Sequence, residues 1–152
     1  GMPFMQAGQE FLRSKGGDTN SYKSSDLVNS LKWSTQSANA STVKYFKGLI
    51  SLRKAHPAFR METTDQVKKN LKFLSSPEGT IAYSINGSAV KDSAATLVVV
   101  HNASTSPQSI TLPKSGSWSV LVESGRAGTT VLRKVNGNTI MVEARSTLVL
   151  TQ

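Results

Sequence analysis

Apolar residues fill most of the first twelve positions, in the run GMPFMQAGQEFL, which is interrupted by Gly8 and by a single carboxylate, Glu10. Apolar residues at consecutive rather than alternating positions are typical of a strand that is buried on both faces of a parallel sheet. A parallel strand needs a neighbouring strand and a crossover helix. The pattern therefore predicts a strand at residues 3–7 that belongs to a larger structure.

A helical period follows between Ser41 and Ala55. Apolar residues recur there at intervals of three and four and form one stripe, namely Val43, Phe46, Leu49 and Ile50. Ser41 or Asn39 can cap the start, and Pro57 prevents continuation. We expect this helix to pack against the outside of the first strand. His56, just before the proline, is expected to have a structural role at the helix end.

From Ala58 onward the period changes to two. Thr63 and Gln66 have the spacing of a capping box, which predicts a short helix through Lys69. Strands are predicted at 71–75, 80–86, 95–101, 108–112, 118–123, 130–135, 139–144 and 147–151. Asn136-Gly137 is the strongest hairpin signal between two of them. Short strands at this spacing indicate an antiparallel, Greek-key sandwich.

Trp33 and the four aromatic residues after Pro57 lie in apolar contexts that favour the core; those four are Phe59, Phe73, Tyr83 and Trp118. Carbohydrate-binding sandwiches usually display exposed aromatics in a row, and no such row is visible. His101 follows a predicted buried strand, but no second histidine, cysteine or carboxylate has the spacing of a metal site. We therefore expect a hydrogen-bonded structural His101 and no bound metal.

Four segments resemble a known family: PFMQAGQEF at 3–11, LRSKGGDTNSY at 12–22, LKW at 31–33 and YFKGLISLRKAHPAFR at 45–60. The first is similar to the last barrel strand of α-amylase-type glycoside hydrolases, and the set closely resembles type I pullulanases. The resemblance implies an α+β chain in two parts. Residues 1–57 would be the remnant of the last strand-loop-helix unit of a β/α barrel, and 58–152 a C-terminal β-sandwich domain.

The resemblance also implies an activity for the parent enzyme, the hydrolysis of α-1,6-glucosidic bonds in pullulan and branched α-glucans such as starch or glycogen. The family's catalytic carboxylates follow the fourth, fifth and seventh barrel strands, which this sequence does not contain. We therefore expect no catalytic residue, no cofactor and no activity of the chain alone. Glu10 matches the family motif, which implies an orienting role behind the residues that touch substrate.

Residues 13–40 are rich in Gly, Ser, Asn and Thr and form a long irregular segment. Loops that follow barrel strands lie at the face where substrates bind. This predicts Arg13, Asp18, Asn20 and Tyr22 near α-glucan in the intact enzyme. The alternative is that Asp18 and Asn20 hold turns and that Tyr22 covers a helix.

The net charge of +9 raises the alternative of a polyanion or nucleic-acid binder, but the excess is spread, with 8 basic and 3 acidic residues before Pro57 and 10 and 6 after it. Cysteine is absent, and no signal peptide or membrane span is readable; the parent family is secreted, cell-surface or cytoplasmic.

A stabilising role for the sandwich is favoured over weak carbohydrate binding. An uncovered strand and helix stripe would favour self-association or disorder of the first residues.

Overall fold

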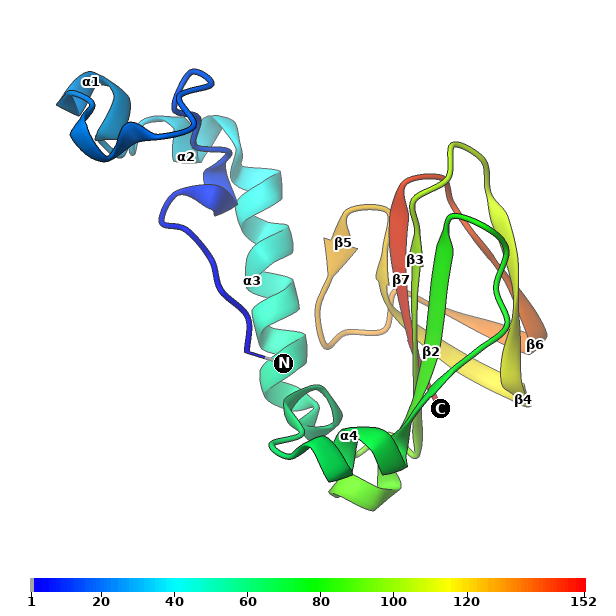
Figure 1. Ribbon diagram of the computed structural model, residues 1–152. Coiled ribbons are helices and arrows are strands. Elements are labelled where there is room, and N and C mark those ends of the chain that lie inside the picture. Colours follow the sequence, from blue (N-terminus) through cyan, green and yellow to red (C-terminus); the bar gives the residue numbers. More distant parts are fainter. Residues whose placement is uncertain (1) are drawn as a thin grey trace.

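The computed structural model describes residues 2–152, and Gly1, with which the predicted apolar run begins, lies outside the described residues. The long helix α3 (Ala40–Ala55) stands between an irregular N-terminal segment and a β-domain (Figure 1). The other helices are short: η1 (Gln9–Phe11), η2 (Ser21–Lys23), α1 (Asp26–Asn29), α2 (Thr35–Ala38), η3 (Pro57–Arg60), α4 (Thr64–Asn70) and η4 (Ser88–Val90).

The strand predicted at residues 3–7 is wrong for this chain. Residues 2–6 are irregular, and the chain then turns at Gly8, whose φ is 92°, into η1. Phe4 is 94% exposed. A strand requires hydrogen-bonding partners along at least one edge, and no other part of residues 2–152 pairs with this segment. The apolar run therefore lies along α3 without forming a strand (Figure 1).

The main helix begins and ends as its period and its proline predict, at Ala40 and Ala55. Asn39 precedes the first turn, but its side chain does not cap the helix; its Nδ2 donates to the carbonyl oxygens of Phe11 and Thr35 at 3.1 and 3.0 Å. Asn39 thus attaches η1 to the start of α3. The helix contacts η1 on one side and the β-domain on the other.

The capping box of α4 is confirmed. The Thr63 hydroxyl accepts a hydrogen bond from the backbone N–H of Gln66 at 3.2 Å, and the Gln66 side chain accepts from the N–H of Thr63 at 3.3 Å. This reciprocal pair satisfies two of the N–H groups that a helix start leaves without partners.

The β-domain is one antiparallel sheet of seven strands in the order β1-β2-β3-β7-β4-β5, with β6 pairing to β4. Their bounds are β1 (Leu71–Phe73), β2 (Thr80–Asn86), β3 (Thr96–Asn102), β4 (Gln108–Glu123), β5 (Arg126–Ala127), β6 (Arg133–Val142) and β7 (Ser146–Thr151). The antiparallel all-β character predicted from the period of two is confirmed.

Two details of the strand prediction are wrong. The predicted strands 108–112 and 118–123 are one long strand, β4, whose register with β6 shifts between Thr111 and Gly116. Asn136 and Gly137 do not make a hairpin turn but lie inside β6, opposite Ser117 and Gly116. The φ of 112° at Gly137 bends the strand where its partner has the same irregularity.

Three clusters of buried residues hold the strands and helices together. The largest joins residues of β2, β3 and β7 to residues of β4 and β6, so that the sheet folds over on itself. Val98 and Val100 belong to this cluster, whereas Val99, on the opposite face of β3, packs toward α3. A third cluster lies under η3. The β-domain therefore has one face against its own strands and one against the helix.

The predicted core aromatics separate into two groups. Trp118 is fully buried, and its Nε1 donates to the Lys114 carbonyl oxygen at 3.3 Å. Phe73 is 76% exposed because β1 is the edge of the sheet and leaves the ring with one neighbour, Tyr83. Trp33 is 62% exposed, with only Phe11 in ring contact, at 5.5 Å between centroids. The prediction of Phe73 and Trp33 as core residues is wrong.

Candidate functional site

The segment that the sequence predicts near a ligand is held in shape by its own polar contacts. Arg13 donates from Nη1 to the Ala7 carbonyl oxygen at 3.4 Å and from Nη2 to that of Asn29. Its Nε is buried and has no partner among the described residues. Gly8 has to be glycine here, because a Cβ at this position would lie 2.9 Å from Arg13. The Arg13 side chain is therefore committed to closing the loop between η1 and α1.

Asp18 and Asn20 lie together in a turn. Asp18 Oδ1 accepts from the backbone N–H of Asn20 at 2.9 Å, and its Oδ2 accepts from the Ser24 hydroxyl. The hydrogen bond from Ser24, followed by that from Asn20, lowers the pKa of the Asp18 carboxyl below its ordinary value of 3.8. These bonds favour the ionised form, and they match the alternative in which Asp18 and Asn20 hold a turn.

Tyr22 presents an exposed aromatic ring to the solvent. Its side chain is 75% exposed, with the Lys23 Nζ 5.4 Å from the ring centroid. Glu10 lies apart from it, in a hollow between the N-terminal segment and α3 that Phe46 and Ile50 also line. The contacts within residues 2–152 thus join Asp18 to Asn20, but they do not join Arg13, Tyr22 and Glu10 in one cluster.

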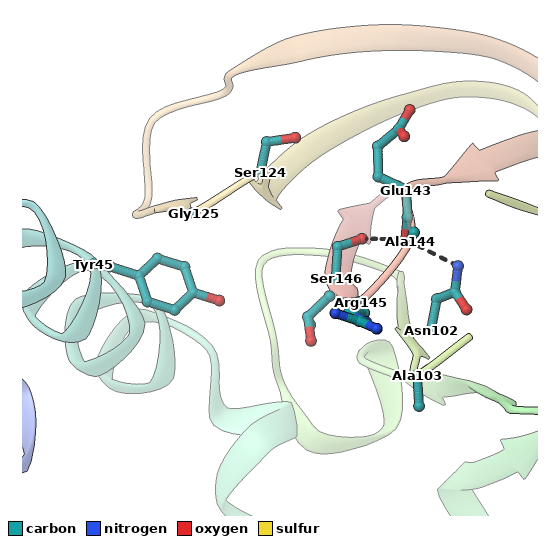
Figure 2. A pocket seen from close by; sticks show the side chains of 10 residues that line it. Tyr45, Asn102, Ala103, Ser124, Gly125, Glu143, Ala144, Arg145 and Ser146 are labelled. Carbon is teal, nitrogen blue, oxygen red and sulfur yellow. Dashed lines mark hydrogen bonds between the residues drawn. The ribbon is translucent and has the colours of Figure 1, made fainter. Parts of the chain in front are cut away.

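A second, larger hollow lies where α3 meets the end of the β-domain (Figure 2). Its volume is about 770 Å³, within the range of small-molecule sites. Tyr45 of α3 bounds one side, the turn at Ser124 and Gly125 another, and residues 143–147 between β6 and β7 the third. No sequence pattern indicates this hollow, because its residues come from separate segments of the chain that no local motif connects.

Close packing of α3 on the β-domain positions Tyr45. A Cβ at Gly48 would lie 2.0 Å from the carbonyl oxygen of Ala127, so only glycine lets the two backbones approach this closely. Tyr45 lies one turn earlier on the same face of the helix. Its ring packs on the cluster that contains Leu52 and Val99, and burial raises the pKa of its hydroxyl above 10.0.

Hydrogen bonds hold the opposite wall. Asn102 Nδ2 donates to the carbonyl oxygens of Val142 and Glu143 at 3.1 and 2.9 Å. The Ser146 hydroxyl donates to the Glu143 carbonyl oxygen at 2.7 Å, and the Arg145 N–H to that of Ser104 at 3.1 Å. These bonds hold the backbone of the turn between β6 and β7 in place. They do not involve the charged groups of Glu143 and Arg145.

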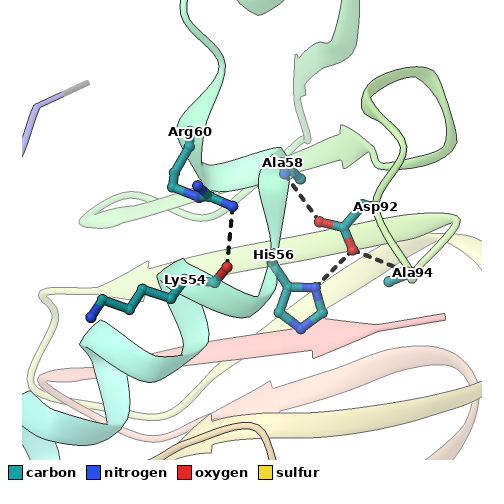
Figure 3. A network of polar contacts seen from close by, with 6 residues as sticks. All are labelled: Lys54, His56, Ala58, Arg60, Asp92 and Ala94. Carbon is teal, nitrogen blue, oxygen red and sulfur yellow. Dashed lines mark hydrogen bonds and ion pairs between the residues drawn. The ribbon is translucent and has the colours of Figure 1, made fainter.

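The two histidines have structural contacts, as predicted. His56 Nδ1 lies 2.7 Å from Asp92 Oδ1, and Asp92 also accepts from the backbone N–H groups of Ala58 and Ala94 at 3.0 and 2.9 Å (Figure 3). Burial acts to raise the pKa of Asp92, but the bonds from Ala94, Ala58 and His56 together lower it. This group ties the end of α3 to the loop before β3. His101 Nδ1 lies 3.0 Å from the Thr147 hydroxyl.

Residues 2–152 contain no group of three or more His, Cys, Asp or Glu side chains that could hold a metal ion. No helix among them combines the length and the apolar character required to cross a bilayer.

The chain is similar to pullulanases and, at lower identity, to isoamylases such as that of Flavobacterium sp, which is 30% identical over 138 residues. Residues 67–126 match the family model described as pullulanase, all-beta domain. The chain is 38% identical over 123 residues to a pullulanase of Bacillus subtilis (strain 168), covering 81% of this chain and 17% of that protein.

Solved structures agree over the whole chain. The pullulanase from Bacillus acidopullulyticus superposes with a TM-score of 0.94 at 41% identity, covering 100% of this chain and 18% of its own. A pullulanase from Paenibacillus barengoltzii, in complex with maltohexaose and α-cyclodextrin, gives 0.87 at 40% identity, covering 99% of this chain and 23% of its own. The chain thus spans about a fifth of the length of these relatives.

Proposed function

The chain belongs to the pullulanase family through its all-β domain, and we propose that it is the C-terminal, non-catalytic part of a starch-debranching enzyme. The parent enzyme hydrolyses α-1,6-glucosidic bonds in pullulan and branched α-glucans. The role of the β-domain is to cover α3 and to stabilise the barrel to which that helix belongs.

One observation carries this proposal: the similarity extends beyond the β-domain. The family model covers 67–126, but the superposition on the Bacillus acidopullulyticus enzyme covers the entire chain, including α3 and the irregular N-terminal segment. A helix packed on the β-domain in the same way supports the division into 1–57, the last strand-loop-helix unit of a β/α barrel, and 58–152, the C-terminal domain. In the intact enzyme, residues 3–7 would find the strand partners that they lack here.

The carboxylates support a non-catalytic role. A retaining glycosidase needs two carboxyl groups about 5 Å apart on either side of the scissile bond. Before Pro57 the chain has only Glu10, Asp18 and Asp26. Asp18 is engaged in its turn, and Glu10 lies in the hollow beside α3. The chain alone is therefore inert, and Glu10 orients neighbouring groups in the parent.

The loop that carries Arg13, Asp18, Asn20 and Tyr22 contributes to the glucan-binding face of the parent enzyme. Arg13 and Asp18 set the loop conformation through the contacts described above, and Tyr22 offers an exposed ring to the apolar face of a sugar. Relatives crystallised with maltose and with maltohexaose favour an α-glucan as the ligand.

A chimera tests the proposal. This chain replaces the matching segment of the Bacillus acidopullulyticus pullulanase, and the release of reducing ends from pullulan is measured beside an enzyme that lacks the segment. We expect the chimera to fold and debranch, and the deletion to lose stability. A folded but inactive chimera would refute the proposal, and so would debranching by the isolated chain.

The isolated chain is also expected to self-associate through the N-terminal segment and α3. Met2, Phe4 and Ile50 expose apolar surface there, which the barrel would cover in the parent. Sedimentation velocity over a range of concentrations measures this association. A monomer at every concentration, with residues 2–30 resistant to proteolysis, would contradict it.

Weak carbohydrate binding by the β-domain is a second candidate function. The hollow beside Tyr45 favours this function, and the chemistry of the residues that line the hollow indicates the class of ligand.

A further inference from the structure

The hollow of Figure 2 contains polar groups that the protein itself does not use. Within residues 2–152, the Arg145 guanidinium, the Glu143 carboxylate and the Ser124 and Tyr45 hydroxyls have no hydrogen-bond or ion-pair partner. Figure 2 shows the Tyr45 hydroxyl directed toward the turn that carries Arg145. Four unused polar side chains around one hollow are a feature of binding sites, where a few placed polar groups orient a ligand.

The charges of the wall limit the chemistry of the ligand. Arg145 is only a donor and ionised Glu143 only an acceptor, whereas the hydroxyls of Ser124 and Tyr45 can do both. An anion would meet the repulsion of Glu143, and a cation that of Arg145. A neutral molecule with many hydroxyl groups satisfies all four, because each of its hydroxyls both donates and accepts. A saccharide has this chemistry.

The site is held ready before binding. Asn102 and Ser146 fix the backbone of the turn between β6 and β7, and Gly48 fixes the distance between α3 and β5. The Tyr45 ring is half-buried against the core, so that its hydroxyl loses little freedom on binding. Pre-organised groups of this kind lower the entropic cost of association.

We propose that this hollow is a saccharide-binding site of the β-domain, formed by residues other than those of the loop that carries Tyr22. The ligand is a short α-glucan segment, an assignment that rests on the proposed function. Arg145 and Glu143 bind its hydroxyls from one wall, and Tyr45 and Ser124 from the others. Such a site would keep a branched polymer near the enzyme between cleavage events.

Titration of the full 152-residue chain with maltotriose, followed by NMR amide shifts, tests the proposal. We expect saturable shifts at residues 124–125 and 143–147, with a dissociation constant on the order of 1 mM. Arg145→Asn removes the guanidinium and should weaken binding about tenfold, the effect of losing one hydrogen bond to a charged group. Asparagine tolerates the φ of 49° at this position. Tyr45→Phe, which removes only the hydroxyl, should weaken binding severalfold.

Lys91→Asn is the matched control. Lys91 has a φ of 58°, close to that of Arg145, and its replacement removes the same positive charge. Lys91 lies outside the hollow. We expect its affinity to equal that of the unmodified chain. Shifts confined to other residues, or equal weakening by Lys91→Asn, would overturn the proposal, and so would equal binding of cellotriose, a β-linked glucan. Debranching by the chimera measures the proposed function separately, because an active chimera with no maltotriose binding refutes this site alone.

Discussion

Replacing Gly48 by alanine tests whether close packing of α3 on the β-domain determines the arrangement of this chain. Two effects oppose each other. Alanine in the middle of a helix is favoured over glycine by about 1 kcal/mol, which alone would stabilise the protein. However, the added Cβ would lie 2.0 Å from the carbonyl oxygen of Ala127 and 2.5 Å from its carbonyl carbon. Both atoms belong to the backbone and cannot rotate away.

The magnitude follows from this geometry. Ordinary contact begins at 3.4 Å, so α3 and β5 would have to separate by about 1.4 Å. That separation loosens the cluster in which Leu52 packs against Val99 and Val149. Forced displacement in a packed core costs about 1–3 kcal/mol, and the loss of contacts adds to it. We therefore expect Gly48→Ala to lower the free energy of unfolding by about 1–2 kcal/mol despite its better helix propensity.

Urea unfolding followed by tryptophan fluorescence measures the change, because Trp118 is buried in the β-domain. Two controls separate the effects. Ser51→Ala, at an exposed position of the same helix, should be neutral or slightly stabilising. Gly128→Ala, beside β5 but with no atom nearer than 3.9 Å, should be tolerated. If Gly48→Ala were as stable as Ser51→Ala and left the amide signal of Ala127 unchanged, the packing argument would be refuted.

Three further predictions concern the remaining features. Asp92→Asn should destabilise the chain by about 3 kcal/mol in urea unfolding, since it breaks a buried pair with His56. Because the pKa of Asp92 is lowered in the folded state, its contribution to the free energy of unfolding is complete above the unfolded pKa of 3.8 and is lost as the pH falls toward the folded pKa. The asparagine variant should lack this pH dependence of stability between pH 5 and 2. An unchanged profile of stability against pH would refute the assignment. Leu150→Ala, at a fully buried site on β7, should cost about 2–5 kcal/mol, and a loss below 1 kcal/mol would contradict the core assignment. In the chimera, Tyr22→Ala should raise KM for pullulan severalfold, whereas Phe73→Ala, equally exposed on β1, should not; equal effects would count against the loop.

The sequence alone determined the features that depend on neighbours along the chain. The ends of α3, the capping box of Thr63 and Gln66 and the course of β2 follow from period, propensity and local hydrogen bonds. The family resemblance was likewise readable, because motifs are local. Of the proposed glucan-binding residues, the sequence indicated those of the loop that carries Tyr22, but not those of the hollow beside Tyr45.

Only the tertiary structure decided features that depend on partners distant in sequence. Asn136-Gly137 has the composition of a hairpin turn, yet the partner strand β4 makes it part of β6. Residues 3–7 have the composition of a strand, but no partner within the described chain pairs with them. The hollow beside Tyr45 exists because Gly48 lets α3 approach Ala127 and thereby brings together turns far apart in the sequence. A strand, a core position or a site requires its spatial neighbours, and no local pattern specifies those.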